Sequence, residues 1–156
     1  METCMNAYIE IVAAAFATLF FALMRRTPNR VLLLTTILGA SGWALFSIIE
    51  GYNEMAAYFA AALFIGILAE IFARIKKTPT TVILICGIIP LVPGVLFYET
   101  MMYFVQDDTN QAIQSGVDTL LSAGSMVFAI IVSTLLGKHI INPITKFIRS
   151  KKVKKA

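Results

Sequence analysis

The sequence is poor in charged side chains and in the residues that build metal and redox sites. Only 14% of its 156 residues are charged, whereas soluble domains carry roughly 25%. It has one histidine, His139, and two cysteines, Cys4 and Cys86. These scarcities argue against a disulfide framework, a metal site or a bound cofactor. The sequence also lacks a phosphate-binding glycine loop, a paired-carboxylate site and a nucleophile–histidine arrangement, so we expect no enzyme.

Apolar side chains are abundant instead. They make up 58% of the residues, and the mean hydropathy is +0.81. A water-soluble fold of this length could not bury that much apolar surface. The composition therefore predicts an integral membrane protein, with the lipid bilayer as its solvent.

Five apolar runs are long enough to span a bilayer, which takes about 17–25 residues. Short polar stretches separate them, two of which contain Thr-Pro. Loops this short place successive helices side by side and antiparallel. We therefore expect an all-α bundle of five transmembrane helices in residues 1–137, followed by a basic cytoplasmic tail, 138–156. The five predicted helices span residues 8–24, 31–49, 55–75, 81–105 and 117–137.

The basic residues predict the orientation. All 13 lysines and arginines fall in the 25–30 loop, the 74–77 region and the tail. Short loops rich in Lys and Arg stay in the cytoplasm, so five crossings place the N-terminus outside and the C-terminus inside. The tail fits an anionic membrane surface. Because it lacks interleaved aromatics, we expect no nucleic-acid binding. Glu70 and Arg74 have the spacing of an ion pair within one helix.

The fourth span carries an unusual Pro-x-x-Pro-Gly motif, formed by Pro90, Pro93 and Gly94. Proline removes a backbone donor and clashes with the carbonyl four residues earlier. We expect the helix to break into residues 81–89 and a second half that begins near Gly94. The N-terminus of such a second half suits a substrate carboxylate, as in the discontinuous helices of transporters. The alternative is a proline kink kept only for packing.

Glu99 and Tyr98 lie shortly after this motif. An ionisable residue within a membrane span is by default a functional candidate. Glu99 could neutralise a substrate ammonium group or carry a coupled proton, or it could simply reach the outer interface. The predicted substrate-binding residues are therefore Pro90, Pro93, Gly94, Tyr98 and Glu99.

Two stretches, PNRVLLLTTILGASGW and IIPLVPGVLFYETM, carry a resemblance to the threonine/serine exporter (ThrE) family. The chain is similar to the short C-terminal half that many bacteria encode as a separate subunit. The resemblance implies half of a transporter in the bacterial inner membrane, whose partner is a longer ThrE-like half. It also implies export of threonine and serine driven by the proton motive force. Some two-subunit members are linked to dicarboxylate (succinate) export.

The leading hypothesis is a subunit of a small-solute exporter, with threonine or serine as substrate. The alternatives are a dicarboxylate exporter subunit, a non-transporting membrane scaffold or assembly subunit, and a pore-forming homo-oligomer.

Overall fold

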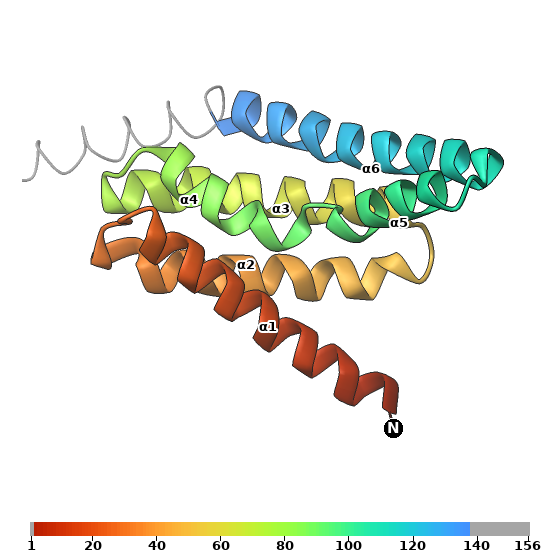
Figure 1. Ribbon diagram of the computed structural model, residues 1–156. Helices are drawn as coiled ribbons and strands as arrows, with labels where there is room; N and C mark the ends of the chain where they lie inside the picture. The colour runs from red at the N-terminus through yellow and green to blue at the C-terminus, as the bar shows by residue number, and fades with distance from the viewer. Residues whose placement is uncertain (1, 138–156) are drawn as a thin grey trace, which may run out of the picture.

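The computed structural model describes residues 2–137, with side chains from Tyr8 onward, and the regular structure in that range is helical (Figure 1). The predicted tail, residues 138–156, lies outside the described residues. The elements are α1 (Glu2–Met24), α2 (Asn29–Glu50), α3 (Glu54–Lys76), α4 (Thr80–Ile88), the 3₁₀ turn η1 (Ile89–Leu91), α5 (Gly94–Val105) and α6 (Thr109–Leu136).

Two Thr-Pro turns of the same design connect α1 to α2 and α3 to α4. Arg26 and Lys77 adopt left-handed backbone conformations, with φ of 52° and 53°. The next residues, Thr27 and Thr78, each donate a backbone hydrogen bond to a carbonyl five residues earlier, at 3.0 and 2.9 Å. The prolines that follow occupy the N-cap positions of α2 and α4. This local chemistry ends one helix, reverses the chain and starts the next.

Helix α3 forms the centre of the bundle and packs against α2, α4 and α6. Its inward face is rich in alanine, and small side chains let membrane helices approach closely. These buried alanines are Ala57, Ala61, Ala62, Ala69 and Ala73. Helix α5 packs on α6, whereas α1 packs on α2 and diverges from it toward the N-terminus (Figure 1).

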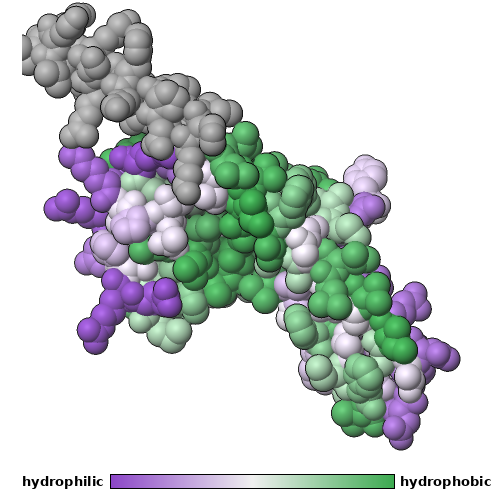
Figure 2. Space-filling model, turned by 90° about the horizontal axis from the view of Figure 1, so that it is seen from above, coloured by the Kyte–Doolittle hydropathy of each residue, from purple (hydrophilic) through white to green (hydrophobic). Residues whose placement is uncertain are grey.

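The surface has the polarity of a membrane protein. Figure 2 shows a broad apolar zone between polar ends. Three helices, α2, α3 and α6, are long and apolar enough to cross a membrane. The bent pair formed by α4–η1 and α5 makes a fourth if it counts as one span. The apolar Tyr8–Met24 part of α1 is shorter, so five crossings remains a prediction.

Helix α6 begins at Thr109, eight residues before the predicted start at 117. The Asp108 side chain accepts a hydrogen bond of 3.2 Å from the backbone N–H of Gln111 and so caps the helix. The polar residues after the cap are thus helical, although their low hydropathy suggested a loop. Because an N-cap satisfies an otherwise unpaired backbone donor, it outweighs hydropathy in setting a helix start.

Candidate functional site

The fourth apolar run is interrupted in its middle. Helix α4 ends at Ile88, η1 follows, and α5 begins at Gly94 with its axis turned by 49° (Figure 1). The interruption occupies the segment where the sequence predicts a break. Within it, Val92 donates a backbone hydrogen bond of 3.2 Å to the Ile89 carbonyl, and Gly94 donates one of 2.6 Å to the Val92 carbonyl. Short-range bonds replace the regular helical ladder here.

When α4–η1 and α5 are counted as one span, the break falls near its middle, and one side of the break is exposed. From Thr80 to Pro90 the rise is about 15 Å at 1.5 Å per residue, half of a hydrocarbon core of about 30 Å. Pro93 is buried, but Val92 and Gly94 are exposed. A Cβ built on Gly94 would meet nothing within 4 Å. Irregular backbone at this depth has to face protein or water, because lipid offers no hydrogen bonds.

The first turn of α5 is electropositive. It has no side-chain cap and no acidic residue, and its N–H groups point along the helix toward the break. The N-terminus of a helix carries roughly half a positive charge and attracts carboxylates and phosphates. This part of the chain can therefore attract the carboxylate of a solute.

A cavity of about 270 Å³ lies against the break. It forms where α1 diverges from the bundle, and its walls come from α1, α2 and η1 (Figure 1). Apolar atoms dominate the lining, and one carboxylate joins them. The lining residues are Glu10, Ala13, Ala14, Ala17, Trp43 and Pro90.

A second cavity, of about 200 Å³, is polar and lies among the N-terminal turn of α3, α5 and α6. Three carboxylates make it electronegative, so it favours a cation or an ammonium group over an anion. Its lining residues are Glu54, Leu96, Glu99, Tyr103, Gln111, Gln114, Ser115 and Asp118. Among the described residues, no group of His, Cys, Asp and Glu side chains is arranged to hold a metal ion.

Hydroxyl groups join α5 to α6 beside this polar cavity. Thr100 Oγ1 donates to the Leu96 carbonyl at 2.8 Å and lies 3.1 Å from Ser115 Oγ. Because Thr100 has already used its only hydroxyl proton, Ser115 is the donor in that contact. The bond fixes the wall of the cavity that carries Ser115.

The structure separates the predicted site residues into two places. Pro90 lines the apolar cavity, whereas Glu99 lines the polar one. Tyr98 is 65% exposed and lines neither of them. The tertiary structure therefore does not bring Glu99 to the break, although only a few residues separate it from Gly94.

The predicted ion pair between Glu70 and Arg74 is confirmed. Arg74 Nη2 donates to Glu70 Oε2 at 3.0 Å and to the Gly137 carbonyl at 2.8 Å. The same guanidinium thus ties α3 to the end of α6. This contact is structural, because it satisfies a buried carboxylate and a helix-terminal carbonyl together.

Sequence reasoning missed Glu10 and Trp43, which meet Pro90 in the apolar cavity. A signal for Glu10 was present. Glu10 lies about 21 Å of helical rise before Met24. A membrane-spanning helix would therefore hold this carboxylate inside a hydrocarbon core of about 30 Å. Ala13 and Ala17 follow on the same helix face, at the spacing expected for one side of a helix. Nothing in the sequence indicated that this face turns toward Pro90.

Comparison with known proteins agrees with the helix arrangement. The model of the family described as "Threonine/Serine exporter, ThrE" matches residues 10–136. The chain is 27% identical to a probable threonine/serine exporter of Mycobacterium tuberculosis over 94 residues, which cover 60% of this chain and 17% of that protein. It is 26% identical to a threonine/serine exporter of Corynebacterium glutamicum over 133 residues, which cover 85% of this chain and 26% of that protein.

No solved structure matches the chain. The matched region corresponds to about a quarter or less of each of these two relatives. The family match includes the helix break and most of the described helices. The chain is therefore a membrane protein that belongs to the threonine/serine exporter (ThrE) family, whose relatives named above are bacterial.

Proposed function

We propose that this chain is a subunit of a bacterial inner-membrane exporter that moves threonine and serine out of the cell. In this proposal the proton motive force drives export, and a ThrE-like partner half completes the carrier. The chain acts as a transporter and not as an enzyme.

The helix break at Pro90–Gly94 carries the proposal. Unpaired backbone groups at mid-membrane depth are stable only beside protein or water, and secondary transporters use such discontinuous helices to bind substrates. A kink kept only for packing would bury its loosened backbone against neighbouring helices. Here Gly94 and Val92 remain exposed, which supports a pathway at this position.

The charges support an amino acid as substrate. The positive N-terminus of α5 suits the substrate carboxylate. Glu99 and its two acidic neighbours in the polar cavity suit a positively charged ammonium group. A dicarboxylate such as succinate carries no positive group and would be repelled there. We therefore assign Pro90, Pro93 and Gly94 to the carboxylate side of the pathway, and Tyr98 and Glu99 to its outer part.

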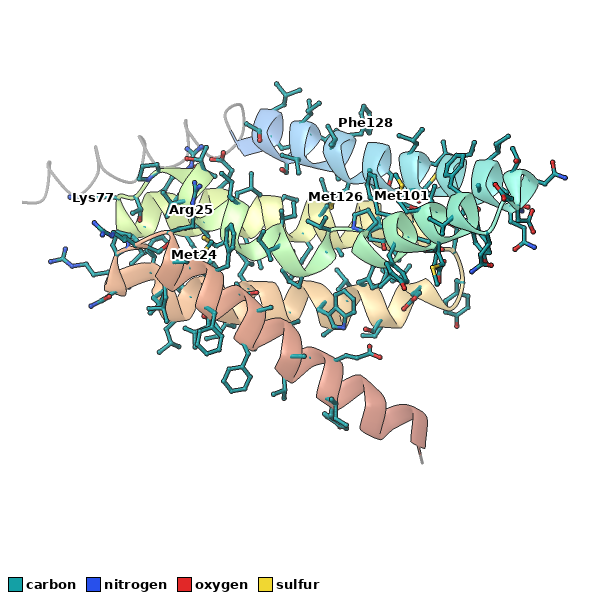
Figure 3. All side chains as sticks on the ribbon, viewed as in Figure 1. Met24, Arg25, Lys77, Met101, Met126 and Phe128 are labelled. Atoms are coloured by element: carbon teal, nitrogen blue, oxygen red, sulfur yellow. The ribbon has the colours of Figure 1, made fainter. Side chains whose placement is uncertain are left out.

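Charge segregation supports an N-terminus outside the cell. Figure 3 shows Arg25 and Lys77 at the same end of the bundle. The helix ends on the opposite side carry acids, including Glu54 and Asp107. Lys and Arg favour the cytoplasmic side, so the polar cavity opens toward the outside.

A partner half explains the open side of the break. The chain matches only 26% of the Corynebacterium glutamicum exporter, so that relative contains much more polypeptide than this chain supplies. In the proposed complex, a second half covers Val92 and Gly94 and closes the pathway on that side. The partner half supplies further helices, because this chain alone has few for a complete carrier.

Reconstitution tests the proposed function. The chain is placed in proteoliposomes with its ThrE-like partner half, and efflux of labelled serine, threonine and succinate is measured with and without an imposed proton gradient. We expect efflux of serine and threonine that requires both subunits and the gradient. Efflux of succinate alone would support the dicarboxylate alternative. Efflux from the partner half alone would indicate a scaffold, and gradient-independent leakage through this chain alone would indicate a pore.

A further inference from the structure

We propose that the apolar cavity between α1 and the helix break is a binding site for the α-amino acid substrate, with Glu10 as the group that holds its ammonium. This inference rests on the proposed function and deepens it. It moves the principal contact for the substrate amine from Glu99 to a residue on the first helix.

The composition of the cavity fits a small zwitterion. Its volume of about 270 Å³ lies just below the range of about 300–1,000 Å³ typical of drug-sized ligands. Ala13, Ala17 and Pro90 offer apolar contacts for a short side chain. Glu10 is the only carboxylate among the described residues of the lining, so it is the group in this cavity that can hold a positive charge.

Glu10 needs a polar partner that the described part of the chain does not supply. It is exposed, and the described side chains include no cation paired with it. On a membrane-spanning α1, its position about 21 Å from Met24 would lie inside a hydrocarbon core of about 30 Å. A carboxylate at that depth faces a cavity or a partner group. A substrate ammonium would meet this requirement.

Trp43 adds a second unused polar group. Its Nε1 is buried and has no hydrogen-bond partner among the described residues, while the residue itself lines the cavity. A buried donor without a partner calls for an explanation. Trp43 also packs against Phe46 in a tilted arrangement with ring centroids 5.2 Å apart, and the ring centroids of Phe46 and Tyr58 are 4.6 Å apart. These contacts hold the indole as a firm wall for the ligand.

The two ends of the site match the two charges of an amino acid. Pro90 belongs to the break that leads into the electropositive start of α5, whereas Glu10 belongs to the wall that α1 supplies. An α-amino acid can thus place its carboxylate toward the break and its ammonium toward α1. A dianion or an uncharged solute would leave Glu10 without a partner.

Trp43 allows a direct binding test, because it is the only tryptophan of the sequence. The full chain is purified in lipid nanodiscs, and its fluorescence is followed while L-threonine is added. We expect a saturable change in the wild type and in Asp107→Asn, a control that removes an exposed acid outside the cavity. Glu10→Gln, a neutral side chain of the same shape, should weaken binding about tenfold or more, as expected for the loss of a charge-assisted hydrogen bond.

Two further arms define the contact. Glu10→Asp should restore part of the affinity, because it retains the negative charge. The probe 3-hydroxybutyrate, which is threonine without its amino group, should bind weakly to the wild type and equally weakly to Glu10→Gln. Thermal unfolding of each variant checks that the fold is retained.

The outcomes separate this inference from the proposed function. The inference is overturned if the fluorescence of the wild type does not change with threonine, even where efflux is normal. It is also overturned if Glu10→Gln binds threonine as tightly as the wild type does. Loss of binding in Glu99→Gln but not in Glu10→Gln overturns it as well. Saturable, Glu10-dependent binding without efflux in the reconstituted complex supports the site and contradicts the exporter function.

Discussion

At the scale of single residues, glycines decide how closely the helices approach. A Cβ built on Gly39 would collide with Thr18 of α1, and one built on Gly66 would collide with Ser133 of α6. Gly124 differs, because a Cβ there would meet nothing within 4 Å. The sequence shows all three as small residues in apolar helices, and only the packing distinguishes them. Small residues at helix contacts are a general device of membrane bundles.

Gly66→Ala should therefore destabilise the protein. The added methyl group would lie 2.6 Å from Ser133 Cβ, and overpacking of this kind costs about 1–3 kcal/mol. Thermal unfolding in detergent measures the change. Gly124→Ala is the matched control and should leave stability unchanged or raise it slightly, because alanine favours helix over glycine. In a Ser133→Gly background, which removes the clashing side chain, Gly66→Ala should cost less stability than it does in the wild type; an equal cost would mean that this contact is not the cause.

At the scale of elements, local chemistry dominates. The Thr-Pro turns end and restart helices as the sequence indicates, and the helix breaks at the Pro-x-x-Pro-Gly segment. The start of α6 was misjudged, because the low hydropathy of residues 109–116 hid a capped helix. Proline and glycine act through the backbone and can be read locally. A helix start among polar residues depends on a single capping hydrogen bond and is harder to see.

Replacing Pro90 and Pro93 together by alanine should make one continuous helix of α4 and α5. The 49° bend should open, and spin labels at positions 81 and 105 should move apart. We expect export to fall to background while the amount of protein in the membrane stays the same. Pro79→Ala is the control, because that proline occupies an N-cap and not a helix interior. Normal export from a straightened helix would favour a packing role for the prolines.

At the scale of the whole molecule, charge separates along the bundle axis. The basic loops lie at one end and the acid-bearing loops at the other. An apolar zone lies between them (Figure 2), as expected for the part of a membrane protein that faces lipid. The positive-inside rule then predicts that the basic end of the chain lies in the cytoplasm.

Cysteine labelling should confirm this orientation. In a variant that lacks Cys4 and Cys86, Asp107→Cys should react with a membrane-impermeant maleimide added to intact cells. Lys77→Cys should react only after the membrane is permeabilised, because its turn is expected on the inner side. The opposite pattern would reverse the topology. Labelling of both positions from outside would mean that the segment between Lys77 and Asp107 does not cross the membrane an odd number of times.

The sequence by itself determined that the protein is a membrane protein, that its fold is all-α and where the helix breaks. The apolar composition requires lipid as the solvent. Short loops require that successive helices lie antiparallel as neighbours. Proline in a helix interior interrupts the helix. The Glu70–Arg74 pair was equally accessible, because both partners lie on one helix at a known spacing.

The tertiary structure alone decided which residues share a cavity. Glu10, Trp43 and Pro90 come from three separate elements, and only the packing of α1 against α2 and η1 brings them to one cavity. Glu99 lies near the break in sequence, yet the turn of α5 carries it to a different cavity. Sequence spacing specifies neighbours within a helix, whereas contacts between helices depend on crossing angles that packing sets. For that reason the break was predictable from its own residues, and the walls around it were not.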